Sequence, residues 1–304
     1  CPVTLNQDMK AIVPDERLIP DYLRFYIIGN ESNLLQEWRK QGATVESIEQ
    51  QFLSQHRILL APIEEQRTIA AYLDHKTEQV DTLIAKKQRL ISLLQEQRTA
   101  VINRAVTKGL DFDAPMQDSG IDWIGRMPSH WTTRPVKYAS DNHDSRRIPL
   151  SSSERGGRKG EYPYYGANGV IDHLDDYIFE GEYVLVGEDG APFFETHRDV
   201  ALLASGQFWV NNHAHILLPH DDMDTRFLVH AMNRVDYREY ITGSTRDKLT
   251  QTDLSRIMIP SPPLEEQRAI AEYLDSVIDQ INGVIKKEQW LIDKLRELRT
   301  SLIS

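Results

Sequence analysis

Histidine and acidic residues at short spacing raise the first chemical hypothesis for this sequence. His213 and His215 are two positions apart, so on a strand both side chains would lie on one face, and Glu188 with Asp189 could complete a metal site. A metal-dependent hydrolase is therefore one reading of these residues. Other enzyme patterns are missing from the sequence. Its one Pro-Pro pair, Pro262-Pro263, precedes a helical pattern and not a methyltransferase-type aromatic, and no G-x-x-x-x-G-K-[ST] loop for nucleoside triphosphates occurs. We expect no catalytic residues, no metal and no cofactor.

Clustered basic residues suggest a second kind of chemistry, the binding of nucleic acid. Between 145 and 160 the one acidic residue is Glu154, and Gly156, Gly157 and Gly160 predict a flexible loop. Arginine and lysine bind phosphates or, through two donors, guanine edges. A solvated surface loop is the alternative interpretation. The candidate nucleic-acid contacts in this loop are Arg146, Arg147, Arg155, Arg158 and Lys159.

Polar residues beside predicted turns add further candidates. The segment 243–249 begins with glycine and offers two cations, Arg246 and Lys248, which we rank above the other polar candidates. Tyrosine in such a domain is also a common core residue, so the aromatic candidates keep both interpretations. The remaining candidates are Tyr164, Tyr165, Asn168, Asn211, Asn212 and His213.

An internal repeat organises the elements that must position these residues. The segment that starts at Pro62 returns at Pro263, and the alignment of 62–103 on 263–304 gives about 21 identities in 42 positions. A weaker match extends upstream, where 11–14 lies over 216–219. This alignment places Cys1 opposite Gly206, inside the second repeat. We therefore expect a chain that is a fragment or a processed form, with the front of its first repeat missing.

Each repeated segment predicts a long helix. A proline suits the first helical position, and the glutamate pair behind it favours the positive helix N-terminus. Apolar residues then recur at alternating spacings of four and three, which predicts a coiled-coil seam. The seam positions are Ile69, Leu73, Val80, Leu83, Leu90, Leu94 and Val101 in the first helix, and Ile270, Leu274, Val277, Ile281, Val284, Leu291, Leu295, Leu298 and Leu302 in the second.

Two charged residues interrupt the seams at equivalent positions. Lys87 in the first helix and Glu288 in the second are related by the repeat. If the helices bury their seams against each other in antiparallel orientation, both charges lie near the middle of the pair. We predict that they form an ion pair that sets the register. The alternative is that each side chain extends out of the seam into solvent.

Between the helices the pattern changes twice. The segment from Lys108 to Ser129 lacks sustained periodicity and predicts a connector. From about 134 to 260, short apolar runs alternate with Gly, Asn and Asp, as in 183–186 and 215–218, and predict strands with tight turns. One helix is expected from Asp224 to about Tyr237. The predicted fold class is thus α+β, a mixed α/β domain joined to two long helices packed as an antiparallel coiled coil.

In chain order these residues resemble the specificity subunits of type I restriction-modification systems. The resemblance covers the chain from Leu5 to its end, and its strength lies in the order of six elements together with the duplicated helix. The elements are Asp118-Ser-Gly-Ile-Asp-Trp-Ile-Gly125 with Pro128-Ser-His-Trp131, Tyr164-Tyr-Gly-Ala-Asn-Gly169, Gly187-Glu-Asp-Gly190, Trp209-Val-Asn-Asn-His213, Gly243-Ser-Thr-Arg-Asp-Lys-Leu249, and Pro262-Pro-Leu-Glu-Glu-Gln-Arg-Ala-Ile270.

The resemblance implies a non-catalytic subunit that reads DNA. In that family two target-recognition domains each read half of a split double-stranded site, and the two helices bind two methyltransferase subunits, which restriction subunits join. The implied division is 1–60, the C-terminal part of the first recognition domain; 61–106, the first helix; 107–133, a connector; 134–261, the second recognition domain; and 262–304, the second helix. The implied partner-binding residues are Glu65, Gln66, Arg67, Glu266, Gln267 and Arg268.

The net charge of −11 is the main argument against a DNA reader. Phosphate neutralisation supplies much of the affinity of such proteins, so any DNA contact here must rest on local charge. The acidity favours the alternative of a scaffold that binds only proteins through its coiled coil. A single cysteine and the lack of a long apolar run predict a cytoplasmic protein without membrane association.

Overall fold

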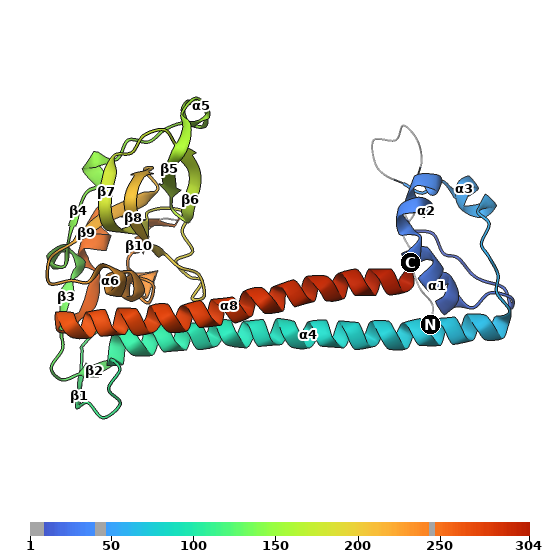
Figure 1. Cartoon of the computed structure of the whole chain (residues 1–304), viewed down its shortest axis with the longest axis horizontal. Helices are drawn as coiled ribbons and strands as arrows, with labels where there is room; N and C mark the ends of the chain where they lie inside the picture. Colours follow the sequence, from blue (N-terminus) through green and yellow to red (C-terminus); the bar gives the residue numbers. More distant parts are fainter. Residues whose placement is uncertain (1–8, 40–46, 243–246) are drawn as a thin grey trace. The chain divides into compact units, whose positions relative to one another are not determined.

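Two long helices dominate the structure, a computed structural model that describes residues 9–39, 47–242 and 247–304. Helix α4 spans Ile63–Lys108 and helix α8 spans Leu264–Ile303 (Figure 1). Both predicted long helices are confirmed, with ends within two residues of the expected ones. Among the described residues, no helix combines the length and the apolar character that crossing a bilayer requires.

The chain divides into two compact units, and each long helix contributes to both. Unit 1 comprises Cys1–Ser92 and Val284–Ser304, and unit 2 comprises Leu93–Gly283. Unit 1 is helical in its described part. Besides the segments of α4 and α8 it contains α1 (Pro20–Gly29), α2 (Glu31–Trp38) and α3 (Gln50–Gln55).

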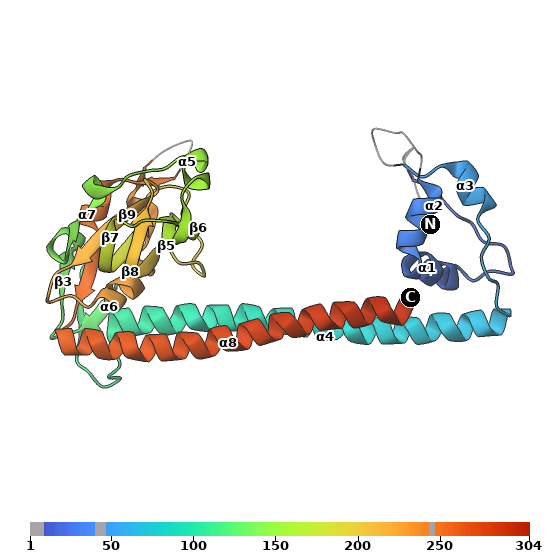
Figure 2. The same cartoon turned by 45° about the horizontal axis from the view of Figure 1, so that its top comes forward.

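Unit 2 is built on a six-stranded sheet with the order β4-β9-β7-β8-β5-β6 (Figure 2). All of its pairings are antiparallel except β5 with β8. The apolar runs at 183–186 and 215–218 lie in β7 and β9, as predicted. The strands are β4 (Ser140–Asn142), β5 (Lys159–Gly166), β6 (Gly169–Leu174), β7 (Phe179–Gly187), β8 (Ala201–Val210) and β9 (Ala214–Pro219).

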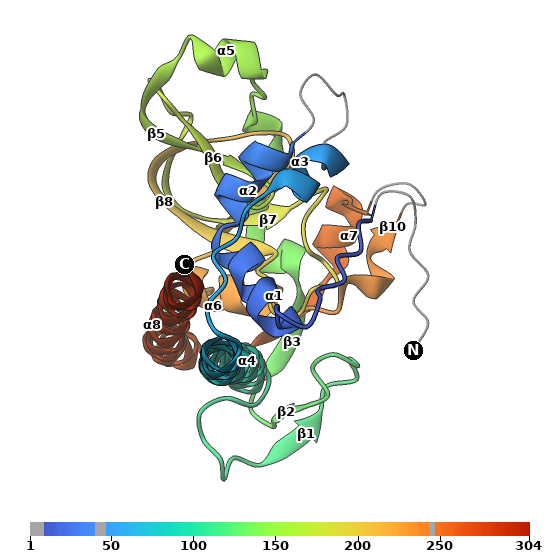
Figure 3. The ribbon, with the colours of Figure 1, turned by 90° about the vertical axis from the view of Figure 1, so that its right-hand side faces the viewer.

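Short elements surround this sheet. Helix α6 covers it and packs on β7 and β8, whereas α5 and the β5–β6 pair lie on the side of the unit away from α8 (Figure 3). The smaller elements are β1 (Met116–Asp118), β2 (Arg126–Pro128), β3 (Thr132–Pro135), η1 (Val136–Tyr138), η2 (Asp144–Arg146), α5 (Ser152–Gly156), α6 (Thr225–Met232), η3 (Tyr237–Glu239), β10 (Ile241–Thr242), β11 (Lys248–Leu249), α7 (Gln251–Arg256) and β12 (Met258–Ser261).

The main core of unit 2 extends beyond the sheet. It includes Ile102 and Val106 from the end of α4, and Ile270 and Leu274 from the start of α8. The segment predicted as a connector also takes part, because β1 pairs with β2 and Trp131 is 1% exposed within this core. Its lack of periodicity reflects irregular structure that is nonetheless packed.

The helix expected from Asp224 to about Tyr237 is shorter than predicted. Asp224 caps it by accepting a hydrogen bond from the Phe227 backbone N–H, and the helix ends at Met232. A separate 3-10 turn, η3, then begins at Tyr237. Its apolar face is fully packed, since Phe227, Leu228 and Met232 are all buried.

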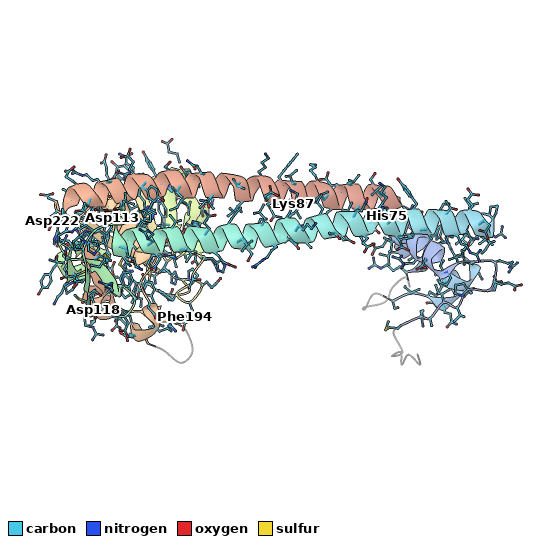
Figure 4. The ribbon with its side chains drawn as sticks, turned by 90° about the horizontal axis from the view of Figure 1, so that it is seen from below. His75, Lys87, Asp113, Asp118, Phe194 and Asp222 are labelled. Carbon is cyan, nitrogen blue, oxygen red and sulfur yellow. The ribbon has the colours of Figure 1, made fainter. Side chains whose placement is uncertain are left out.

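Within unit 1 the two long helices are antiparallel. Lys87 contacts Glu288 and Asp81 contacts Arg299, so higher numbers in α4 meet lower numbers in α8. The Lys87 Nζ atom lies 2.7 Å from Glu288 Oε2, and the two side chains are 20% and 13% exposed. The predicted pair is thus confirmed, and Figure 4 labels Lys87 on α4 beside α8.

The predicted seam is buried only in part. Leu73, Val80 and Ile281 are buried, as are Ile270 and Leu274 in the core of unit 2. Leu83, Leu90, Val284 and Leu298 are 42%, 40%, 43% and 49% exposed, so the prediction of a continuously buried seam was wrong at these positions. Two helices in contact bury a narrow face, which leaves flanking apolar side chains partly in solvent.

Candidate nucleic-acid interface

Four segments of unit 2 meet beside the sheet and carry five of the thirteen predicted nucleic-acid contacts, namely Asn168, Asn211, Asn212, His213 and Lys248. We call them the loop cluster, defined by residues 167–168, 188–190, 211–213 and 248–249. Backbone hydrogen bonds join three of them: the Glu188 N–H donates to the His213 carbonyl at 2.8 Å, and the Leu249 N–H donates to the Glu188 carbonyl at 2.8 Å. The Asn168 side chain joins the fourth segment to Gly190. The turns therefore occupy fixed positions on a rigid scaffold.

Gly187 explains how these segments approach so closely. A Cβ atom at this position would lie 2.3 Å from the Ala191 Cβ and 3.3 Å from the Ala167 carbonyl oxygen. Any larger residue would push the segment after β7 away from the β5–β6 turn. The predicted motif Gly187-Glu-Asp-Gly190 thus begins with a glycine that packing requires.

Two carboxylates, Asp144 and Glu188, organise the charge beneath this cluster. Asp144 accepts hydrogen bonds from His215 Nδ1, the Ile216 backbone N–H and Gln251 Nε2. Burial raises the pKa of Asp144, but the hydrogen bond and charge of His215, the Ile216 backbone N–H and the charge of Arg147 together outweigh it and hold that pKa below its usual value. Asp144 is therefore ionised at neutral pH.

Glu188 accepts from two of the predicted DNA-binding cations. Its Oε2 lies 2.6 Å from Arg147 Nη1, and its Oε1 lies 3.0 Å from Lys248 Nζ. Burial raises the pKa of Glu188, but the hydrogen bonds from Arg147 and Lys248 more than offset this and lower it. Lys248 is 50% exposed and Arg147 only 14%, so the lysine offers more surface to a ligand.

The two histidines of the metal hypothesis do not converge on one site. His213 Nδ1 lies 2.6 Å from Asp189 Oδ1, whereas His215 is fully buried against Asp144. Asp144, Glu188 and His215 do bring possible ligand atoms within 4.8 Å of one another. These three side chains do not fit a metal, because the Arg147 guanidinium group already binds the Glu188 carboxylate and lies 3.5 Å from Asp144. A divalent cation there would face a guanidinium group.

The amide candidates divide into buried and exposed groups. Asn211 is 7% exposed, and its Oδ1 accepts from the His213 backbone N–H, so it supports the turn. Asn168 and Asn212 are exposed, and Asn168 Nδ2 donates to the Gly190 carbonyl at 3.0 Å. His213 retains 41% of its side-chain exposure. Asn168, Asn212, His213 and Lys248 are thus the cluster's accessible polar side chains among the sequence candidates that are described.

The basic segment at 146–159 is more ordered and more neutralised than predicted. Ser151 caps α5 in a capping box with Glu154, so the expected glycine-rich flexible loop is a short helix followed by β5. Arg155 and Lys159 both bind Asp172, and Arg158 binds Asp175 at 3.0 Å. Lys159, followed by the His173 backbone N–H, lowers the pKa of Asp172 to about 2. Strand pairing of β5 with β6 supplies acids that the local sequence does not reveal.

Arg146 and the aromatic candidates have mainly structural contacts. Arg146 donates to the Ile178 carbonyl and lies over the Phe179 ring. Tyr164 is fully buried, and its hydroxyl accepts from the Leu150 backbone N–H. Tyr165 packs edge-on against Phe208, and burial raises its pKa. The core interpretation therefore describes Tyr164 fully and Tyr165 in part, while Arg246 lies outside the described residues.

The repeated Glu-Glu-Gln-Arg motif contains an internal anchor. Gln66 is 0% exposed and Gln267 is 1% exposed. Gln66 accepts from the Ile19 N–H and donates to two carbonyls, and Gln267 accepts from the Asp224 N–H and donates likewise. Neither glutamine has surface left for a partner, contrary to the role expected for them. Their repetition reflects a shared way of attaching the chain in front of each helix.

The other members of that motif remain accessible. Glu65, Arg67 and Arg268 are exposed. Glu266 is partly exposed and binds His130 Nε2 at 2.7 Å and Trp131 Nε1 at 2.9 Å. A role of these four residues in partner binding stays a prediction.

The fold and this site define a class of protein that comparison with known families identifies. Residues 141–289 match the family described as the type I restriction modification DNA specificity domain. This segment contains the six-stranded sheet from Asp141 onward, the loop cluster and much of α8. Over this segment the chain is similar to the DNA specificity domains of type I restriction-modification systems, the family that the sequence resemblance implied.

Particular relatives agree with this assignment. A Haemophilus influenzae chain named as a type I restriction enzyme specificity subunit is 36% identical over 144 residues, which cover 47% of this chain and 36% of that protein. A Methanocaldococcus jannaschii specificity subunit, MjaX, is 26% identical over 98% of this chain and 70% of its own length. A solved chain from a study of type I system assembly and conformational transition has a TM-score of 0.67 at 19% identity, over 93% of this chain and 70% of that one. The chain thus spans about a third of the first relative and most of the second.

Proposed function

We propose that this chain is the DNA-reading component of a type I restriction-modification complex and that it performs no catalysis itself. The observation that carries the proposal is the loop cluster, where Asn168, Asn212, His213 and Lys248 present amide, imidazole and ammonium groups from interlocked turns. Base edges are read by hydrogen-bonding groups of this kind held in fixed positions. The match of residues 141–289 to DNA specificity domains supports the same function.

The charge distribution indicates how the domain would approach a duplex. Arg147, Arg155, Arg158 and Lys159 all form ion pairs within unit 2, so these four candidate cations are already partly neutralised before any phosphate approaches. We therefore expect weak affinity for arbitrary DNA from this chain alone. Partner subunits would supply additional positive surface, and base contacts would supply the discrimination.

We further propose that residues 1–60 are the C-terminal part of a first recognition domain, equivalent to the one formed by 134–261. Helices α1 and α6 begin at Pro20 and Thr225, 205 positions apart, the same shift that relates the upstream parts of the sequence repeat. Each helix is preceded by a backbone N–H that binds the anchoring glutamine, Gln66 or Gln267. Residues 134–261 would then be the complete recognition domain of this chain.

The partners proposed here are double-stranded DNA, two methyltransferase subunits and the restriction subunits of the complex. The repeated surfaces of α4 and α8 support two copies of one partner, because each helix presents the same exposed residues, such as Arg67 and Arg268. We propose a cytoplasmic location, which a DNA-reading role requires.

A salt series tests the DNA-reading function. The purified chain, alone and with its methyltransferase partner, is titrated with random-sequence duplex DNA between about 50 and 200 mM salt. We expect the logarithm of the binding constant to fall linearly with the logarithm of salt concentration, more steeply with the partner present. Duplex selected from a random pool should also bind more tightly than the unselected pool. Absence of duplex binding under both conditions would leave the protein scaffold as the better function.

A further inference from the structure

Glu188 has an unusual position for an acidic residue in a DNA-reading surface. It follows β7 within the loop cluster and is 13% exposed, and its two oxygens bind two different cations, Arg147 and Lys248. A carboxylate repels the phosphates of DNA, so an acid beneath a DNA-binding surface should weaken binding. We therefore ask what Glu188 contributes in return. Its contacts indicate what that contribution is.

The two cations that share Glu188 differ in how firmly they are held. Arg147 also donates to the Asp144 and Ala214 carbonyls and is 14% exposed, so its guanidinium group is fixed in the scaffold. Lys248 is 50% exposed, and in the described part of the chain Glu188 is the one acid that its ammonium group contacts. Of the two, Lys248 is able to leave Glu188 and reach a ligand.

We propose, on the basis of the DNA-reading function above, that Glu188 is a positioning residue that restrains Lys248 and thereby sets the sequence discrimination of the loop cluster. On arbitrary DNA, a phosphate must compete with Glu188 for the ammonium group, so Lys248 contributes little. On the correct sequence, base contacts from neighbouring turns bring the duplex close enough for the exchange to become favourable. Glu188 thus suppresses binding to wrong sequences more than binding to the right one.

Arg147 explains why this exchange does not leave Glu188 unpaired. When Lys248 leaves Oε1, Arg147 remains bound at Oε2 at 2.6 Å, and His215 Nδ1 lies 3.8 Å from the same oxygen. The carboxylate therefore keeps hydrogen-bonded and charged neighbours throughout. Loss of a single exposed contact is small compared with isolation of a buried charge.

The test is the substitution Glu188→Gln in the full chain, assayed with and without the methyltransferase partner. Glutamine keeps the shape and an acceptor oxygen but removes the charge that restrains Lys248. We expect affinity for random duplex to rise about 3- to 10-fold at low salt, and the log–log salt slope to become more negative by about 0.9, the value for one added phosphate contact. The ratio of selected-duplex to random-duplex affinity should fall by a similar factor.

Two variants assign the effect to Lys248 rather than to a general change of charge. The double variant Glu188→Gln with Lys248→Met should lose the gain in random-duplex affinity. Glu180→Gln serves as the matched control, because Glu180 lies on β7, the strand that Glu188 follows, and its contact in the described structure is with the neutral Gln207 side chain. It removes the same charge and should leave the salt slope unchanged.

The outcomes separate this inference from the proposed function. If the unchanged chain binds duplex with a salt slope but Glu188→Gln binds random duplex equally or more weakly while remaining folded by circular dichroism, Glu188 has only a structural role. Persistence of the gain in the double variant would also overturn the inference. Failure of the unchanged chain to bind any duplex would instead reject the function on which it rests.

Should Glu188→Gln unfold the domain, the single variant Lys248→Met decides the question. We expect it to leave the affinity for random duplex unchanged and to weaken the binding of selected duplex. Equal losses on both kinds of duplex would refute the proposed restraint of Lys248 by Glu188.

Discussion

In both units a buried glutamine holds the chain in front of the long helix, but the short helix that precedes it is packed differently in the two units. In unit 2 the helix α6 packs on the sheet, and Phe227, Leu228, Ala231 and Met232 are buried. The repeat relates these residues to Tyr22, Leu23, Tyr26 and Ile27 of α1, which are only partly buried. Leu23, Tyr26 and Ile27 line an apolar hollow of about 380 Å³ in unit 1.

The repeat therefore has two parts, the glutamine anchor and the apolar face of the short helix, which the sequence alone does not distinguish. The glutamine anchor is satisfied within each unit and needs no sheet, since Gln66 and Gln267 bind the same kinds of backbone groups. The apolar face of the short helix, in contrast, is buried only where the described structure places a sheet against it. The anchor therefore reflects how the helices are built, and the sheet-facing residues reflect the recognition domain.

The largest expected contrast comes from truncating the equivalent aromatic residues of the two short helices. Phe227→Ala should destabilise unit 2 by about 3–5 kcal/mol, because it leaves a cavity in a fully packed core. Tyr22→Ala should cost only about 1 kcal/mol, because this side chain is partly exposed. Hydrogen exchange measured by mass spectrometry reads α1 and α6 separately and avoids assuming a two-state transition. Equal losses of protection in both helices would mean that their packing is equivalent after all.

A smaller and equal effect is expected at the two anchors. Gln66→Ala and Gln267→Ala each remove three hydrogen bonds to backbone groups, so each should destabilise its own unit by about 2–3 kcal/mol. Gln79→Ala is the matched control, since this residue lies on the exposed surface of α4 and should change stability by less than about 0.5 kcal/mol. Denaturant-dependent hydrogen exchange provides the measurement. A much larger loss at one anchor would show that only that glutamine is structural and would reopen a partner-binding role for the other.

Features set by residues close together in the sequence could be predicted, whereas features set by distant residues could not. The ends of α4 and α8 follow from local signals, proline at the start and apolar spacing along the helix, and β7 and β9 follow from short apolar runs. The ion pairs of Arg155, Arg158 and Lys159 depend on the register between β5 and β6, which brings Lys159 opposite Leu174. No local pattern reports that register. The burial of Gln66 and Gln267 was also hidden, because repeated polar residues on a helix equally suggest a binding surface.

The predicted site was recovered unevenly for the same reason. Polar residues in turns between strands, such as Asn168 and His213, are indeed accessible and lie together in the loop cluster. The basic segment was overestimated because its acidic partners come from a neighbouring strand. The sequence suggested Glu188 only as a possible metal ligand. Its actual neighbours, Arg147 and Lys248, lie 41 and 60 positions away in the sequence.

The smallest expected effect concerns Lys87 and Glu288, the one charged pair that the repeat itself predicted. The pair lies within unit 1 at 2.7 Å with little exposure, so reversing one charge places two like charges in a partly buried contact. Lys87→Glu should therefore lower the unfolding temperature of unit 1 by a few degrees, and Lys87→Glu with Glu288→Lys should restore most of the loss. The coupling energy from the complete cycle should be about 1–2 kcal/mol, within the range for contacting residues.

Lys86→Glu is the adjacent control, since this exposed residue reports the general effect of an added acid on α4. We predict that this pair fixes which turn of α4 meets which turn of α8. A double variant that shows only the sum of the two single losses would contradict that prediction. The register within unit 1 would then have to depend on its apolar side chains, among which Leu73 and Val80 are buried.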